Sequence, residues 1–128
     1  KAIKSGGCLF ITTPALIQFW SYNDDLAHHL RRYNRNDYAN LANHTGLELC
    51  EARYFMFFLS PLYYMSRKWK NIKDMSEDKK KLLMAESHKI PIRPVNTILA
   101  ALFAAETPVG QWLPFPWGTS ILGVFRKL

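Results

Sequence analysis

The fold of this chain is decided first by one stretch near its start, Cys8-Leu9-Phe10-Ile11-Thr12-Thr13-Pro14-Ala15. Its opening run, residues 8–12 between Gly7 and Pro14, is typical of a strand buried on both faces of a mostly parallel sheet. The next twenty or so residues are predicted to form a long loop, and loops of that length in compact domains are usually functional or disordered. The aromatic content argues against disorder: Phe19, Trp20, Tyr22 and Tyr33.

Outward from this strand, the sequence predicts a helix and two more strands. The helix is expected at residues 35–45, with Asn34 or Asn36 as its N-cap and Gly46 at its left-handed exit. Residues 47–53 alternate between apolar and polar and predict a second strand. Residues 119–126 are rich in β-branched and aromatic residues and predict a third, with Trp117-Gly118 making a tight approach to it.

Two further helices are predicted between the second and third strands. One spans residues 79–88, with Asp74 and Glu77 as a capping box. The other opens at Pro94 and ends at Pro108 and Gly110. Its apolar face follows helical spacing: Val95, Ile98, Leu99, Leu102 and Phe103. The order of elements predicts an α/β fold of one domain.

Composition limits the class of protein. With 48% hydrophobic residues the chain can bury a core. The net charge of +7 favours anionic partners, although a solvated lysine-rich helix explains it equally.

Cys8 and Cys50 lie in apolar runs and are expected to be small buried hydrophobes, reduced in the cytoplasm. Residues 1–7 resemble the end of a helix and a Gly-Gly break, so the chain is expected to be a fragment of a longer protein.

One set of residues carries a family resemblance. The set consists of Gly6-Gly7, Thr13-Pro14-Ala15, Trp20-Ser21, Asp24, His29, Arg31-Arg32-Tyr33, Gly46 and Phe115-Pro116-Trp117-Gly118-Thr119-Ser120. This pattern resembles the C-terminal half of a class I S-adenosylmethionine-dependent methyltransferase of the type 11/12-like group. The resemblance covers nearly the whole chain.

The resemblance implies a partial Rossmann-like methyltransferase sheet. Residues 8–12, 47–53 and 119–126 would be its strands five, six and seven, with the seventh antiparallel and lying between the other two. Residues 1–53 would form a strand-loop-helix-strand unit, 54–110 an inserted helical or lid segment, and 111–128 the terminal strand. The N-terminal cofactor-binding half is lacking, because the family's glycine-rich turn and the acidic residue after its second strand are absent. Activity of this chain alone is therefore not expected.

The candidate chemistry centres on the predicted loop. His29 could act as a base oriented by Asp24; alternatively, Asp24 pairs with Arg31 or Arg32 and His29 packs against aromatic residues. The two arginines could bind a phosphate or carboxylate of the substrate, or form a structural salt bridge. Aromatic side chains could line an acceptor pocket or belong to local core: Trp20, Tyr22 and Tyr33.

The expected function is therefore acceptor binding in methyl transfer from S-adenosylmethionine, the implied cofactor, to a small or lipid-like acceptor. The alternative is a non-catalytic, dimeric interaction module at an anionic membrane surface. Residues 54–70, apolar and aromatic with cations at their end, could lie on such a surface or form a buried helix and lid. No metal site is expected, because the adjacent histidines point apart. Nucleic-acid binding is not expected either.

The same fold predicts a homodimer. If the neighbouring strand of the family's sheet is missing, the strand at residues 8–12 presents an unpaired edge of backbone N–H and C=O groups. Such an edge pairs readily with another chain. The predicted interface is therefore this edge.

Overall fold

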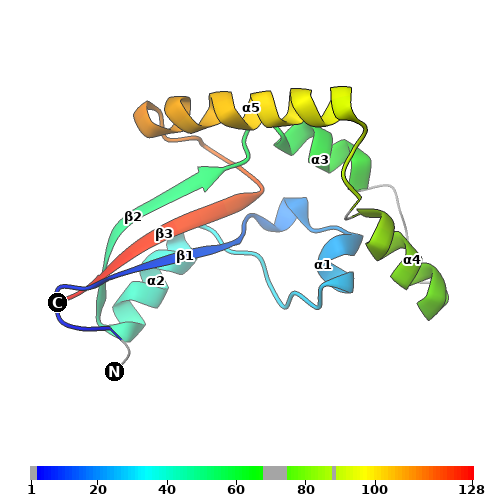
Figure 1. Cartoon of the computed structure of the whole chain (residues 1–128). Coiled ribbons are helices and arrows are strands. Elements are labelled where there is room, and N and C mark those ends of the chain that lie inside the picture. The colour runs from blue at the N-terminus through cyan, green and yellow to red at the C-terminus, as the bar shows by residue number, and fades with distance from the viewer. Residues whose placement is uncertain (1–2, 68–74, 88) are drawn as a thin grey trace.

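The computed structural model describes residues 3–67, 75–87 and 89–128. The described elements are β1 (Cys8–Pro14), the 3₁₀ turn η1 (Ile17–Phe19), α1 (Tyr22–Leu26), α2 (Arg35–Thr45), β2 (Leu47–Phe55), α3 (Ser60–Arg67), α4 (Glu77–Ser87), α5 (Arg93–Trp112) and β3 (Ser120–Lys127). The chain is a mixed α/β protein with one small sheet (Figure 1).

The sheet has the order β1-β3-β2. β3 is antiparallel to both neighbours. It pairs with β1 from Cys8 opposite Arg126 to Pro14 opposite Ser120, and with β2 from Leu47 to Phe55 with a register shift between Leu49 and Glu51. The predicted place of the C-terminal strand between the two earlier ones is therefore confirmed. Its predicted antiparallel direction is confirmed as well. The expectation of a mostly parallel sheet around residues 8–12 is not met, because each neighbouring pair of described strands is antiparallel. β1 and β2 nevertheless run in the same direction, since each is antiparallel to β3.

α2 confirms the sequence prediction closely. Asn34 is the N-cap: its Oδ1 accepts a hydrogen bond from the Asp37 amide at 3.0 Å, and the Asp37 carboxylate accepts the Asn34 amide at 2.8 Å. Gly46 ends the helix with φ 67°, the left-handed conformation in which glycine has no Cβ penalty. Local capping signals were sufficient here because both partners of each cap lie within four residues.

The core lies between α2 and one face of the sheet. Tyr38 and Ala42 of α2 pack with Ile121 and Phe125 of β3. The ring of Tyr38 lies against Gly123, where any side chain would collide with it. Gly118, just before β3, is similarly pressed against the Phe55 carbonyl oxygen, so its close contact is with the end of β2.

The opposite face of the sheet is largely open. Along β1, exposed and partly buried residues alternate, and Phe10 is 68% exposed. Cys8 and Cys50 are also exposed, so the predictions of a strand buried on both faces and of buried cysteines are wrong. The physical reason is coverage: α2 covers one face, whereas on the other α5 contacts only part of the sheet, with Arg53 of β2 bonded to the Gly110 carbonyl (Figure 1).

The helical regions differ most from the prediction. The predicted loop contains η1 and α1. α5 continues through Pro108 and Gly110 to Trp112 and stops at Leu113, which is extended and precedes a proline. Gly110 instead allows close contact with the Phe115 ring. The predicted core face of α5 is substantially exposed, Ile98 to 60%.

The remaining segments are placed as follows. Residues 54–67 divide between the end of β2, a turn and the short α3, whose outer side chains are exposed. Asp74, His88 and residues 68–70 lie outside the described residues. Nowhere in the described ranges does a helix have both the length and the apolar character needed to cross a membrane.

Candidate functional site

The candidate site lies where β1 and β2 end. β1 ends at Pro14 and β2 at Phe55, and β3 begins beside them at Ser120. Since β1 and β2 run in the same direction, both carboxyl ends meet at this edge, the usual place for ligands in α/β sheets. The segment from Ala15 to Tyr33 begins and ends at this edge. Two backbone hydrogen bonds join its ends: the Leu16 amide donates to the Tyr33 carbonyl (2.9 Å), and the Tyr33 amide donates to the Pro14 carbonyl (3.0 Å).

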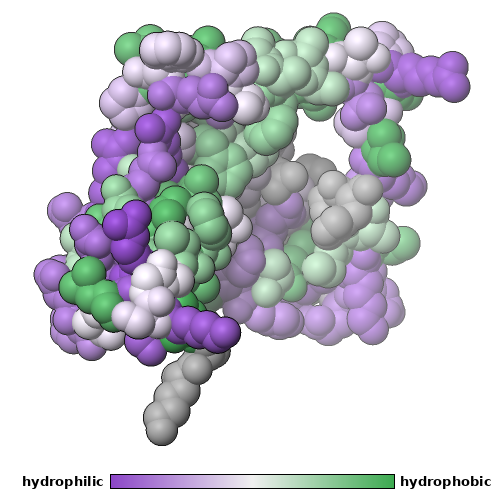
Figure 2. All heavy atoms as spheres, turned by 60° about the vertical axis from the view of Figure 1, so that its left-hand side comes forward, coloured by the Kyte–Doolittle hydropathy of each residue, from purple (hydrophilic) through white to green (hydrophobic). Residues whose placement is uncertain are grey.

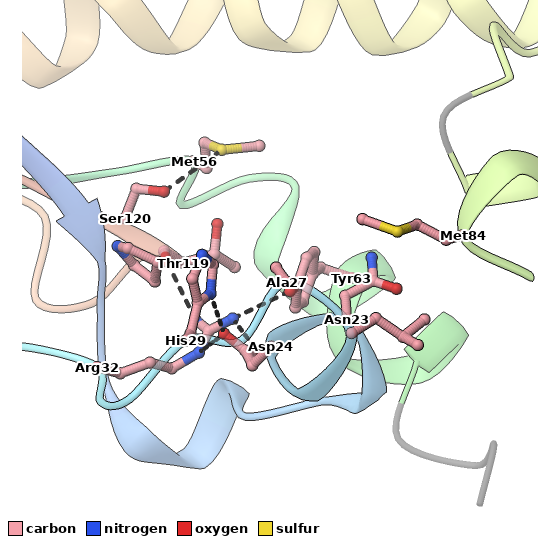
Figure 3. A pocket seen from close by; sticks show the side chains of 12 residues that line it. Asn23, Asp24, Ala27, His29, Arg32, Met56, Tyr63, Met84, Thr119 and Ser120 are labelled. Carbon is pink, nitrogen blue, oxygen red and sulfur yellow. Dashed lines mark hydrogen bonds and ion pairs between the residues drawn. The ribbon is translucent and has the colours of Figure 1, made fainter. Parts of the chain in front are cut away.

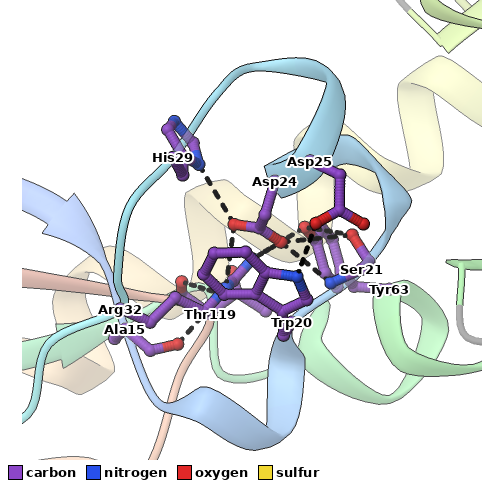
Figure 4. A network of polar contacts seen from close by, with 9 residues as sticks. All are labelled: Ala15, Trp20, Ser21, Asp24, Asp25, His29, Arg32, Tyr63 and Thr119. Carbon is purple, nitrogen blue, oxygen red and sulfur yellow. Dashed lines mark hydrogen bonds and ion pairs between the residues drawn. The ribbon is translucent and has the colours of Figure 1, made fainter.

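Asp24 is the centre of the site (Figure 4). Its carboxylate is 1% exposed. Oδ1 accepts hydrogen bonds from Arg32 Nε and from His29 Nδ1, both at 3.0 Å. Oδ2 accepts from Arg32 Nη2 at 3.0 Å and from the Ser21 amide at 2.9 Å. The Ser21 contact is also the N-terminal cap of α1, so a local helix cap fixes this carboxylate.

Burial alone would raise the pKa of the Asp24 carboxyl. The hydrogen bonds from Arg32, His29 and Ser21 and the charge of Arg32 outweigh burial and lower the pKa below its ordinary value. Asp24 is therefore a carboxylate at neutral pH.

Arg32 is fully engaged by the protein. Nη1 donates to the carbonyls of Ala15 (2.9 Å) and Thr119 (3.2 Å), and Nη2 donates to Tyr63 Oη (3.0 Å) as well as to Asp24. With Nε on Asp24, all five N–H groups of the guanidinium have partners. Of the two roles considered for Arg32, the structure shows the buried structural ion pair with Asp24; the role of substrate clamp stays a prediction.

His29 is held by Asp24 but remains open to solvent. Its side chain is 42% exposed. An ionised carboxylate only accepts hydrogen bonds, so His29 Nδ1 carries a proton toward Asp24. In the neutral imidazole the lone pair then resides on Nε2. The two pairings that the sequence left as alternatives, Asp24 with His29 and Asp24 with Arg32, occur together.

His29 lines a cavity of about 260 Å³ (Figure 3). Part of its wall comes from the strand ends, with Pro14, Met56 and Ser120, and Met84 reaches in from α4 on the other side. The full lining is Pro14, Asn23, Asp24, Leu26, Ala27, His29, Arg32, Met56, Tyr63, Met84, Thr119 and Ser120. The walls are mostly apolar, with a few hydrogen-bonding groups, as in small-molecule sites.

The other sequence-predicted site residues do not line this cavity. Arg31 pairs with Asp37 at 2.6 Å on the surface and lies over the Tyr33 ring. Trp20 Nε1 donates to Asp25 at 3.0 Å, and Tyr22 is buried. These are local packing positions, the second of the two roles considered for the aromatic residues.

Sequence reasoning missed several lining residues. Tyr63 of α3, Met56 after β2 and Met84 of α4 are brought here by tertiary packing from segments without a recognisable motif. Thr119 was in the pattern Gly118-Thr119-Ser120, but only as part of a family resemblance. Nothing in the sequence indicates that its backbone carbonyl accepts a hydrogen bond from Arg32.

Gly6 and Gly7 do not form the glycine-rich turn of a nucleotide-cofactor site. Gly6 and Gly7 lie at the other end of β1, where the Gly6 amide donates to the Lys127 carbonyl at 2.7 Å and the Lys127 amide to the Gly7 carbonyl at 3.0 Å. They are followed by a strand, not by a helix N-terminus that could hold phosphate or carboxylate. Gly6 and Gly7 therefore do not form a phosphate- or carboxylate-binding turn. Within the described ranges, no group of three or more His, Cys, Asp or Glu side chains is placed to hold a metal ion.

Comparison with known proteins gives no relative. No protein-family model matches the chain, and searches of curated proteins and of solved structures found no significant match. The fold and the cavity are accordingly the observations on which function can be argued.

Proposed function

We propose that this chain is the acceptor-binding part of a class I S-adenosylmethionine-dependent methyltransferase, and that the cavity at the carboxyl ends of β1 and β2 binds a small acceptor. One observation carries the proposal: His29, fixed by the buried carboxylate of Asp24, lines an otherwise mainly apolar cavity at that edge. The order β1-β3-β2 with β3 antiparallel is consistent with the end of such a sheet. The identification of these strands as the fifth, sixth and seventh belongs to this proposal.

The chain's own residues would bind the acceptor and take its proton. Pro14, Met56 and Met84 provide apolar contact, and the volume suits a small molecule better than a whole lipid. The acceptor's hydroxyl or amine proton would pass to His29 Nε2, while the Asp24 carboxylate stabilises the imidazolium that forms. The methyl donor would be bound by residues other than those described, so no step is assigned to it.

The test is methyl transfer from labelled S-adenosylmethionine to small phenols, carboxylic acids and amines, catalysed by the protein that the complete gene encodes. We expect the His29→Gln variant to lose roughly 10²- to 10⁴-fold in rate, because it lacks the base. The matched control is His28→Asn, since His28 lies outside this cavity and asparagine tolerates its φ of 54°. Absence of transfer to every acceptor, or an unchanged rate in His29→Gln, would overturn the proposal.

A second measurement uses this chain by itself. Calorimetry with S-adenosylmethionine is expected to give no binding heat, because the chain lacks the glycine-rich turn and the acidic residue through which the family binds this cofactor. Saturable binding would contradict the assignment of this chain to the acceptor side alone.

A further inference from the structure

A second and larger cavity lies between α5 and the open face of the sheet. Its volume is about 560 Å³. α5 contributes Phe103 and Glu106, β3 contributes Leu122, and Phe115 closes one side. Figure 2 shows apolar side chains gathered along α5 at the top of the molecule and continuing onto the region below it. This cavity shares no lining residue with the cavity at His29.

Glu106 gives this cavity an unusual feature. The side chain is 3% exposed although it carries a carboxylate. Oε2 accepts a hydrogen bond from the Phe58 amide at 3.0 Å. Oε1 is buried and has no hydrogen-bond partner among the described residues. A buried carboxylate oxygen without a partner is costly, and folded proteins normally supply one from protein, water or ligand.

The other charged side chains of the cavity do not supply that partner. Arg53 pairs with Glu51, and its Nη1 donates to the carbonyls of Gly110 at 2.8 Å and Gln111 at 3.1 Å. The charges of Glu51 and Arg53 therefore cancel locally. The carboxylate of Glu106 is left as the unbalanced charge of the described lining, so the cavity favours a cation.

We propose that this cavity binds an amphipathic cation: a primary ammonium group on a compact apolar body. Oε1 has almost no accessible surface in this structure, so the Glu106 carboxylate would turn toward the cavity to accept a charge-assisted hydrogen bond from the ammonium. The apolar body would pack against Phe103, Phe115 and Leu122, and the aromatic faces add further attraction for the cation. The inference does not depend on the function proposed for the His29 cavity.

Calorimetric titration of the full chain with three probes of one length tests the charge preference. The probes are hexylamine, hexan-1-ol and hexanoate. Hexylamine is expected to bind at least about tenfold more tightly than hexan-1-ol, and hexanoate not to bind, because only the ammonium complements a carboxylate. No saturable binding of hexylamine up to about 10 mM, or equal affinity for the alcohol, would refute the proposal.

Variants locate the site. Glu106→Gln keeps an acceptor oxygen for the Phe58 amide but removes the charge, and should weaken hexylamine binding about tenfold or more. Glu86→Gln, an exposed position on α4, is the matched control and should bind normally. A folded Glu106→Gln protein that binds hexylamine like the unmodified chain would contradict the proposal.

A second variant keeps the test decisive if Glu106→Gln does not fold. Thr12 lies on the open face of β1 and lines the cavity without contributing to the core cluster. Thr12→Tyr suits a strand and would fill part of the cavity. Circular dichroism should show a retained fold, and hexylamine binding should be lost; retained binding would place the ligand elsewhere.

Discussion

At the residue scale, Arg31 and Arg32 show how neighbouring identical residues acquire different roles. Arg32 is buried and donates to Asp24 and to two backbone carbonyls. Arg31 extends to the surface and pairs with Asp37. In the sequence both are equally plausible as a substrate clamp or a salt bridge. The difference arises because the two side chains have different partners: Arg32 reaches the buried Asp24, whereas Arg31 reaches Asp37 on the surface.

This difference predicts opposite sensitivities to substitution. Arg32→Met leaves the Asp24 carboxylate buried without its main partner and should lower the free energy of unfolding by about 3–5 kcal/mol. Arg31→Met removes an exposed ion pair and should cost under about 1 kcal/mol. Urea unfolding monitored by circular dichroism measures both. Equal losses in the two variants would show that the Arg32–Asp24 pair does not have the buried role assigned here.

The lowered pKa of Asp24 predicts a dependence of stability on acid. The unfolded carboxyl titrates near its ordinary value of about 3.9. Because the folded pKa is lower, the contribution of Asp24 is fully present above about pH 4 and is lost as the pH falls through the folded value. Urea unfolding at a series of pH values should therefore show a fall in the free energy of unfolding on the acid side.

The control for this prediction is the double variant Asp24→Asn, Arg32→Gln, in which amides replace both charges. Its free energy of unfolding should fall less steeply below about pH 4, since the titrating carboxyl is gone. A slope as steep as that of the unmodified chain would assign the acid dependence to other carboxyl groups.

At the scale of elements, α2 and α5 differ in how well the local sequence predicts their ends. α2 was predicted with its boundaries because its start and end signals act over one turn. α5 was predicted to end at Pro108 and Gly110, but it continues to Trp112, and Gly110 packs against the Phe115 ring. The helical spacing of its apolar residues was visible in the sequence, whereas their exposure follows from how little of α5 the sheet covers.

The cap of α2 can be tested with a pair of asparagines. Asn34→Ala removes the side-chain acceptor for the Asp37 amide and should lower the unfolding free energy by about 0.5–2 kcal/mol. Asn36→Ala is the matched control, because Asn36 is exposed within the helix and alanine is the better helix former. Thermal unfolding of the two variants distinguishes them; a larger loss for Asn36→Ala would argue against Asn34 as the cap.

At the scale of the whole molecule, the sheet has an unprotected edge. β1 pairs with β3 along one side, and within the described residues no strand pairs with its other side. The predicted homodimer through this edge thus remains a prediction with a defined interface. An exposed apolar face beside the edge, including Phe10, would add to the driving force.

Sedimentation equilibrium over a range of concentrations measures this association. We expect a dimer, and we expect Phe10→Lys to raise its dissociation constant about tenfold or more, because edge lysines oppose strand pairing. Leu30→Lys is a control on an exposed residue distant in sequence from β1. A single monomeric species at all concentrations would contradict the prediction.

The sequence by itself determined the three strands and the capped helix α2. The place of the last strand between the first two came from the family resemblance, and the pairing of Asp24 with His29 was one of two alternatives. The strands and the helix depend on short-range patterns of apolar residues and caps. Tertiary structure alone decided which arginine is buried, which side chains from α3 and α4 close the His29 cavity, and that Glu106 is enclosed beneath α5. Those outcomes depend on contacts between segments far apart in the sequence, such as Arg32 with Thr119, which are 87 residues apart. Such contacts contribute to the free energy of folding only when the chain has brought the two segments together.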